Sequence, residues 1–225
     1  MLLDFILLDL KCSARKWYYS IFWPLAGLAY LVATGSINDP LSIAVTIAIA
    51  MALNAGFGAM YSIVADYYTK YIEIVTASRV GLVTYTIIKV LSSIVCSAVF
   101  TIPIMLIPSV FTLDTHGLTK ILLLVPLALL LSLPAATLGA LMAHIFPRFE
   151  SVGSTGSVVL LGYVFAPFIV LKALGESNVA QTISLLFPIA HIIYNVNVLI
   201  TILVVAVHQV ILLTALLILV RRRYA

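Results

Sequence analysis

Few side chains in this sequence have the type and spacing that acid–base or metal chemistry requires. The four histidines, His116, His144, His191 and His208, are dispersed and form no H-E-x-x-H pattern, which would set two imidazoles on one helical face around a metal ion. All eight acidic residues fall in loops or at the ends of apolar runs, so no pair of carboxylates lies inside a run to act as general acid and base. We therefore predict that the chain is not an enzyme.

Two polar side chains do lie in the middle of apolar runs. His208 stands beside Gln209, and we favour a neutral imidazole bonded to a neighbouring helix over a proton relay, because no carboxylate lies at the same depth. Asn54 lies in ALNAGFGAM, where Gly56 and Gly58 would let a neighbouring backbone approach closely. We favour an interhelical hydrogen bond from Asn54 over a role in a transport path.

No nucleotide site is expected in this chain. The sequence has no G-x-x-x-x-G-K-[ST] phosphate loop, and its glycine- and serine-rich stretch SVGSTGS (151–157) lacks the lysine of such a loop. The sequence therefore predicts no cofactor in this chain, and energy from ATP would have to come from another protein.

The elements that carry these residues are those of a membrane protein. Of 225 residues, 64% are hydrophobic and only 9% are charged, whereas soluble domains carry about 25% charged residues. A bilayer requires about 20 mostly apolar residues for each spanning helix. The net charge of +4 is scattered between apolar runs, which indicates membrane topology and gives no sign of nucleic-acid binding.

The apolar runs predict an all-α, polytopic fold in one domain, 1–225. Residues 1–16 are expected to form an amphipathic helix at the membrane surface, 146–157 a loop, and 175–197, which contains Pro188, an external broken helical pair. Six transmembrane helices are predicted, at about 17–35, 41–65, 82–110, 121–145, 158–174 and 197–220.

The basic residues predict the orientation of these helices. With six spans and both termini in the cytoplasm, only Lys120 and Lys172 lie outside and Lys89 lies within a span. Nine basic residues then lie inside, namely Lys11, Arg15, Lys16, Lys70, Arg79, Arg148, Arg221, Arg222 and Arg223. This bias is typical of a multi-pass protein of the cell membrane with cytoplasmic ends.

The segment DYYTKYIEIVTASRVG (66–81) is the one charged stretch between two long apolar runs. Read as a single helix, it has an apolar stripe of Tyr67, Tyr71, Ile74, Val75 and Ser78. Its charges would pair locally, with Asp66 next to Lys70 and Lys70 next to Glu73. The residues alone leave two interpretations open, a helix that rests on lipid and a helix that docks on another protein.

Two stretches, KYIEIVTASRVGLVTYTIIKVLSS (70–93) and LLFPIAHIIYNVN (185–197), carry a resemblance to a known family. Together with the order of the other elements, they resemble the permeases of ABC-2 type ABC exporters, with Asn195 and Asn197 where that family usually has a charged residue. The resemblance implies that 66–81 contains a coupling helix that docks on an ATPase. Its predicted residues are Tyr67, Lys70, Tyr71, Glu73, Ile74, Arg79 and Gly81.

The resemblance also implies partners and a transport path. ATP and magnesium would be bound by a separate ATPase subunit, and a second permease copy, identical or paralogous, would complete a dimer within the lipid. Spans two and five would line a path that offers Thr46, Asn54, Gly56, Gly58, Tyr163 and Phe165. A path with no formal charge favours an amphiphilic or lipid-like substrate or drug over a small ion. The alternative function is a stand-alone secondary carrier or a membrane scaffold without an ATPase.

Overall fold

The computed structural model describes residues 7, 17–77, 81–112, 115–175, 177–194 and 197–224. Apart from Leu7, the predicted surface helix at 1–16 lies outside these ranges, as does Arg79. Every described element is helical. In chain order these are α2 (Trp17–Ala33), η1 (Ser36–Asn38), α3 (Pro40–Tyr68), α4 (Tyr71–Ala77), α5 (Gly81–Thr112), α6 (Thr115–Ile145), α7 (Phe149–Ser151), η2 (Val152–Gly156), α8 (Ser157–Leu174), α9 (Asn178–Ser184), α10 (Ala190–Ile193) and α11 (Val198–Tyr224).

Long apolar helices make this a membrane-embedded, polytopic protein. Among the described residues, five helices are long and apolar enough to cross a bilayer, namely Pro40–Tyr68, Gly81–Ile107, Gly117–Ile145, Phe149–Leu174 and Val198–Arg222. They coincide with predicted spans two to six. Their lengths follow from the unbroken apolar runs, because only a helix satisfies its backbone groups within the segment in lipid.

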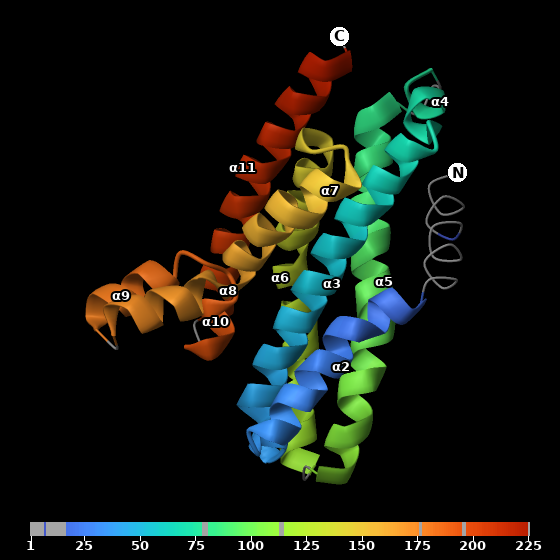
Figure 1. Ribbon diagram of the computed structural model, residues 1–225. Helices are drawn as coiled ribbons and strands as arrows, with labels where there is room; N and C mark the ends of the chain where they lie inside the picture. The colour runs from blue at the N-terminus through green and yellow to red at the C-terminus, as the bar shows by residue number, and fades with distance from the viewer. Residues whose placement is uncertain are drawn as a thin grey trace.

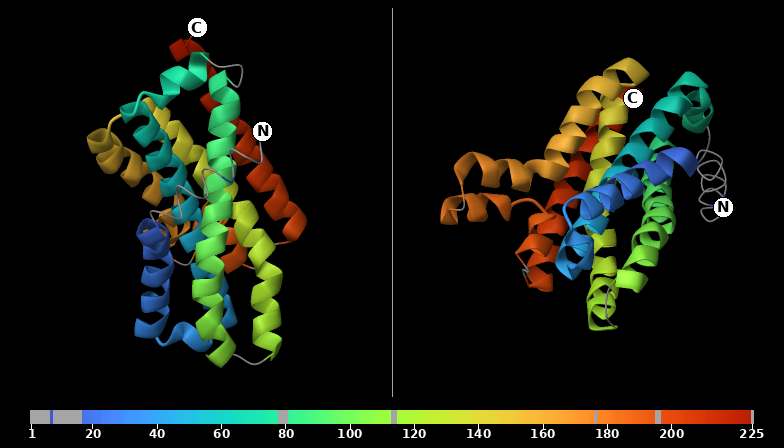
Figure 2. Two further views of the ribbon diagram at one scale, coloured as in Figure 1. Left: turned by 90° about the vertical axis from the view of Figure 1, so that its right-hand side faces the viewer. Right: turned by 60° about the horizontal axis from the view of Figure 1, so that its bottom comes forward.

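Helix α2 is shorter than the other predicted spans. Its 17 residues extend about 26 Å at 1.5 Å per residue, slightly less than the roughly 30 Å of a hydrocarbon core. Its apolar part is Ser20–Ala33, and α2 begins about half-way along the bundle (Figures 1 and 2). The first predicted span, at about 17–35, and with it the total of six, therefore stays a prediction.

The predicted loop at 146–157 is wrong over most of its length. Helix begins at Phe149, and a π-helical turn at Val152–Gly156 carries it into α8. Val152 and Gly156 are buried, and a Cβ on Gly156 would lie 3.1 Å from Sδ of Met60 on α3. Packing against α3 thus overrides the low helix propensity of this glycine- and serine-rich stretch. The wider π-helical turn takes up one residue more than an α-helical turn would.

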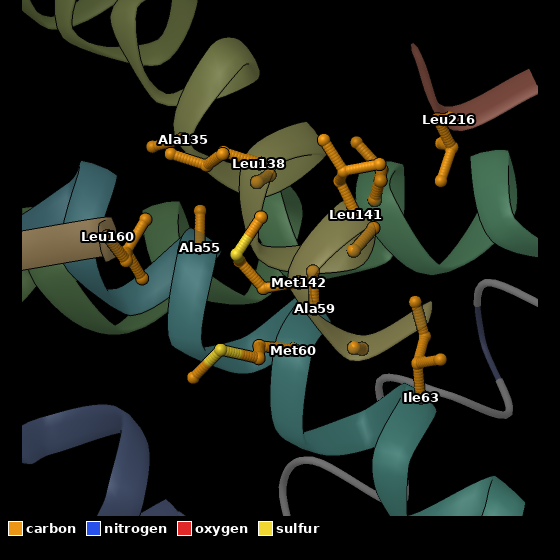
Figure 3. Close-up of a cluster of buried hydrophobic side chains, with 14 of the residues drawn as sticks. Ala55, Ala59, Met60, Ile63, Ala135, Leu138, Leu141, Met142, Leu160 and Leu216 are labelled. Atoms are coloured by element: carbon orange, nitrogen blue, oxygen red, sulfur yellow. The ribbon is translucent and has the colours of Figure 1, made fainter. Parts of the chain in front are cut away.

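Helix α3 lies at the centre of the molecule. In its most apolar stretch 78% of the residues are buried, against 11% in α11. The tightest contact is with α6, where a Cβ on Gly139 would lie only 2.1 Å from the carbonyl oxygen of Gly56. Small residues there let the two backbones approach, as in other membrane helix pairs. Figure 3 shows the side chains that pack around this contact, including Ala55, Ala59 and Ala135.

The end of α8 and the short α9 leave the bundle and project to one side (Figures 1 and 2). Helices α9 and α10 are the broken pair expected around Pro188, with seven and four residues. His191, which is buried, fixes the pair to α11. Its Nδ1 lies 3.0 Å from Oγ1 of Thr201 and its Nε2 lies 2.8 Å from the carbonyl oxygen of Leu185.

Candidate functional site

The described part of the segment predicted as one helix at 66–81 belongs to a helical corner, which we define as residues 66–77 and 81–89 of the chain. Helix α3 ends at Tyr68, Lys70 adopts a left-handed backbone with φ of 59°, and α4 follows. Gly81, with φ of 67°, begins α5. The single-helix prediction is wrong because the left-handed residue at Lys70 interrupts the helical path. Figure 1 shows α4 at one end of the bundle, the same end as α7 and the carboxyl end of α11.

Helix α4 has one face in the protein and one face outside it. Ile72 and Val75 are buried in the core, whereas Glu73, Ile74 and Thr76 are exposed. Ile74 is 66% exposed. The predicted stripe that placed Ile74 beside Val75 is therefore wrong, because α4 turns its 72 and 75 positions inward.

Asp66 makes an ion pair across the corner. Its carboxylate oxygen lies 3.0 Å from Nζ of Lys89, with only 20% and 12% of the two side chains exposed. The same carboxylate accepts a hydrogen bond from the Tyr85 hydroxyl. The predicted local pair with Lys70 is wrong, since Asp66 points toward α5 and Lys70 is exposed. Asp66, Tyr85 and Lys89 therefore connect the end of α3 to the first turns of α5.

A second set of bonds connects the corner to α6. Buried His144 has Nδ1 at 2.8 Å from the Tyr67 hydroxyl and Nε2 at 3.0 Å from Oγ1 of Thr86. Thr86 donates its own proton to the carbonyl oxygen of Leu82 at 2.8 Å. Because the Thr86 proton is used in this way, Thr86 accepts from Nε2–H, and a neutral imidazole would then accept from the Tyr67 hydroxyl at Nδ1. The six side chains of these two sets, which we call the corner network, are Asp66, Tyr67, Tyr85, Thr86, Lys89 and His144.

Sequence reasoning missed this network. It counted Lys89 only as a charge within a span and His144 only as one of four dispersed histidines. A signal existed, because Tyr85 and Lys89 are four residues apart on one helical face. His144 also lies at the carboxyl end of α6, next to the carboxyl end of α3 that carries Asp66 and Tyr67.

Of the predicted path residues on α3, Asn54 and Gly56 face other helices of this chain, whereas Thr46 bonds within its own helix. Oγ1 of Thr46 donates to the carbonyl oxygen of Ser42 at 2.7 Å, and Nδ2 of Asn54 donates to the carbonyl oxygen of Ser20 on α2 at 2.8 Å. The interhelical bond expected from Asn54 is thus present. Gly56 faces α6 and α8, while Gly58 is exposed.

Of the predicted path residues on α8, Tyr163 lies near aromatic rings of the segment before α10 and of α11, whereas Phe165 lies beside Phe168 of its own helix. The Tyr163 ring lies 6.3 Å from the Phe187 ring and 5.9 Å from the His208 ring, and Phe165 lies 6.2 Å from Phe168. Nδ1 of His208 lies 2.9 Å from the carbonyl oxygen of Val204 in its own helix. Its neighbour Gln209 makes the bond between helices, from Nε2 to Oγ1 of Thr137 on α6 at 2.9 Å. The predicted path residues therefore do not meet at one point within a single chain.

A row of aromatic rings runs along the exposed side of α3. Trp23 stacks on Phe57 with centroids 5.4 Å apart, Phe57 on Tyr61 at 5.9 Å, and Tyr61 on Phe149 at 6.4 Å. Phe149 lies 4.8 Å from Tyr68. We call these five residues the aromatic row. It joins α2, α3 and α7 and contains no charged side chain.

Comparison with protein-family models, with curated proteins and with solved structures gave no match for this chain. Within the part of the chain that the structure describes, no three side chains of His, Cys, Asp or Glu gather where they could hold a metal ion. The family and the function are therefore matters for proposal.

Proposed function

We propose that this chain is the permease subunit of an ABC-2 type exporter, with α2 as the first of six transmembrane helices. A separate ATPase subunit would bind ATP and magnesium, and a second permease copy would complete the transporter. Both termini would lie in the cytoplasm of a cell-membrane protein. Figure 1 shows α4, α7 and the carboxyl end of α11 at one end of the bundle. The basic residues next to or within these elements support this orientation, namely Lys70, Arg148, Arg221 and Arg222.

The observation that carries the proposal is the outer face of α4. The apolar residues Ile72 and Val75 are already used inside the protein, so the outer face is a mixture of Glu73, Ile74 and Thr76. A helix that rests on lipid needs a continuous apolar face toward the acyl chains. A single exposed isoleucine among polar side chains fits a protein surface better, with the isoleucine in an apolar pocket and the polar groups around it.

In this proposal the corner transmits motion between the ATPase and the spans. Closure of the ATPase around ATP would move α4, which is only seven residues long and directly follows the left-handed residue Lys70. Coupling of this kind needs a packed element with two discrete arrangements. The two copies of the permease would supply it by moving against each other.

The uncharged aromatic row supports an amphiphilic or lipid-like substrate. Aromatic and small apolar groups give an acyl chain or a drug a large contact surface, but they leave a hydrated ion without ligands. The substrate would enter from the cytoplasm or the inner leaflet. The alternative remains a stand-alone secondary carrier or scaffold. The described spans have no carboxylate in mid-membrane, which is the kind of group that an ion-coupled carrier would use.

Purification under mild detergent tests the proposal. The tagged chain should retain a polypeptide with ATPase activity, and Glu73→Arg should release it, because like charges at a docking surface cost several kcal/mol. Lys172→Glu is the matched charge reversal, since Lys172 is exposed at the far end of α8. Wild-type protein that elutes without any ATPase, in cells that express the neighbouring genes, would favour the carrier or scaffold.

A further inference from the structure

We propose that Asp66, Tyr85 and Lys89 are positioning residues that make α4 and the facing ends of α3 and α5 move as one body. This inference rests on the proposed function for its role in transport. We call these three residues the clamp. Whether they hold the three helices in one fixed arrangement can be tested on the chain alone.

The contacts form an unbroken connection from α4 to two spans. The ring of Tyr71, the first residue of α4, lies 6.2 Å from the ring of Tyr85 on α5. The Tyr85 hydroxyl donates to Asp66 at the end of α3, and Nζ of Lys89 lies 3.0 Å from the same carboxylate. Lys89 Nζ also lies 5.7 Å from the centre of the Tyr85 ring. Each of the three helices is therefore bonded or packed to a shared group of side chains.

The Asp66–Lys89 ion pair is better suited to fixing the relative position of the helices than to stabilising the fold. Removing two charges from water costs several kcal/mol for each ion, and apolar side chains of similar volume often hold two elements together equally well. Apolar surfaces, however, allow helices to slide past each other, because dispersion contacts have no preferred direction. A carboxylate that accepts from both an ammonium and a hydroxyl group fixes the position of one helix along the other.

The second half of the corner network extends the clamp to α6. Tyr67 is next to Asp66 in the chain, and its hydroxyl lies 2.8 Å from Nδ1 of His144. Thr86 is next to Tyr85, and its hydroxyl lies 3.0 Å from Nε2 of the same ring. The clamp thus reaches the helix that packs most closely on α3. A displacement of α4 would therefore reach three spans together.

The test removes the polar contacts of the clamp without creating a cavity. Asp66→Leu, Tyr85→Phe and Lys89→Met are combined in one variant, which removes every charge and hydroxyl of the clamp but keeps its volume. Ser97→Ala is the matched control, because Ser97 donates a hydrogen bond from α5 to the carbonyl oxygen of Met51 on α3 at 2.9 Å, away from α4. Both variants should insert into the membrane and melt close to wild type in detergent.

Spin labels on Thr76 of α4 and Ile87 of α5, both exposed, report whether the corner is one body. In the chain alone in lipid nanodiscs, wild type and Ser97→Ala should give a single narrow label-to-label distance, and the clamp variant a broad distribution. Exchanging the charges, with Asp66→Lys and Lys89→Asp, should recover part of the narrow peak. A narrow peak in the clamp variant would overturn the proposal.

The complex with the ATPase then tests the role in transport. ATP with vanadate should leave the Thr76–Ile87 distance unchanged in wild type, because α4 and α5 move together, and should change it in the clamp variant. The same distances in both proteins would limit the pair to a structural role and overturn the proposal. Wild-type chain that binds no ATPase would instead contradict the proposed function, while the nanodisc distances would still decide whether the corner is a clamp.

Discussion

Adding one methyl group at Gly139 should separate the two best-packed helices of the protein. The Cβ of alanine at this position would lie 2.1 Å from the carbonyl oxygen of Gly56, whereas real Cβ atoms essentially never come closer than 3.0 Å to a neighbour. The difference of 0.9 Å must be made up by movement of α3 away from α6, since both atoms belong to helical backbones and no side-chain rotamer can relieve the overlap.

The change in the free energy of unfolding expected for Gly139→Ala is the sum of two opposing effects. Overpacking of a well-packed core costs about 1–3 kcal/mol, and a clash between two backbones belongs at the upper end of that range. Alanine in a helix is favoured over glycine by about 0.5–1 kcal/mol. The net loss of stability for Gly139→Ala should therefore be about 2 kcal/mol. The control is Gly162→Ala on α8, where an added Cβ would meet nothing within 4 Å.

Reversible unfolding in mixed micelles, followed by circular dichroism as the denaturing detergent is increased, gives the free energy of unfolding for each variant. Gly162→Ala should be neutral or stabilised by up to about 1 kcal/mol, because it gains helix propensity without a clash. The opposite signs of the two substitutions are the diagnostic result. Gly139→Ala as stable as wild type would refute the α3–α6 approach that organises the bundle.

Three further predictions follow from particular residues. With the cytoplasmic end at α4, a cysteine at Thr115 should react with an impermeant thiol reagent from outside intact cells and one at Thr76 should not; labelling at Thr76 would contradict the six-span topology. Asp39 caps α3, and hydrogen bonding, chiefly from the Ser42 side chain, lowers its pKa below the usual value of an aspartate despite the opposing effect of burial. Asp39→Ala should thus cost about 1 kcal/mol near neutral pH, a difference from wild type that should vanish as pH falls through the lowered pKa, because wild type then loses the charged cap. In reconstituted dimers with the ATPase, amphiphiles should stimulate hydrolysis and Tyr163→Ala should blunt the stimulation without lowering the basal rate; stimulation by simple ions alone would contradict the path.

The long helices could be predicted because each depends on one uninterrupted apolar stretch. The helix from Phe149 to Leu174 shows the limit of that reasoning, since its first turns are rich in glycine and serine and become helical by packing on α3. The close approach at Gly56 was expected, but its partner Gly139 was not. Nothing in one apolar helix indicates which of the other helices it will face.

The corner was mispredicted because its bonds are not local. A helix read from sequence pairs Asp66 with Lys70, four residues away, whereas the structure pairs it with Lys89, which lies on the next long helix. Lys70 also adopts a left-handed backbone although it is not a glycine, the residue type that would have indicated this conformation in the sequence. Local spacing therefore identified the segment correctly but predicted the wrong buried face for α4 and the wrong ion pair for Asp66.

A photo-crosslinking amino acid at Ile74 tests most directly whether the outer face of α4 docks on an ATPase. The control places the same group at Leu203 on α11, because the two side chains are 66% and 64% exposed. In membranes of intact cells, irradiation should join position 74 to a polypeptide that contains an ATP-binding phosphate loop, identified by mass spectrometry, while position 203 should give lipid adducts. Lipid adducts alone at position 74 would contradict this docking and would place α4 on the membrane surface.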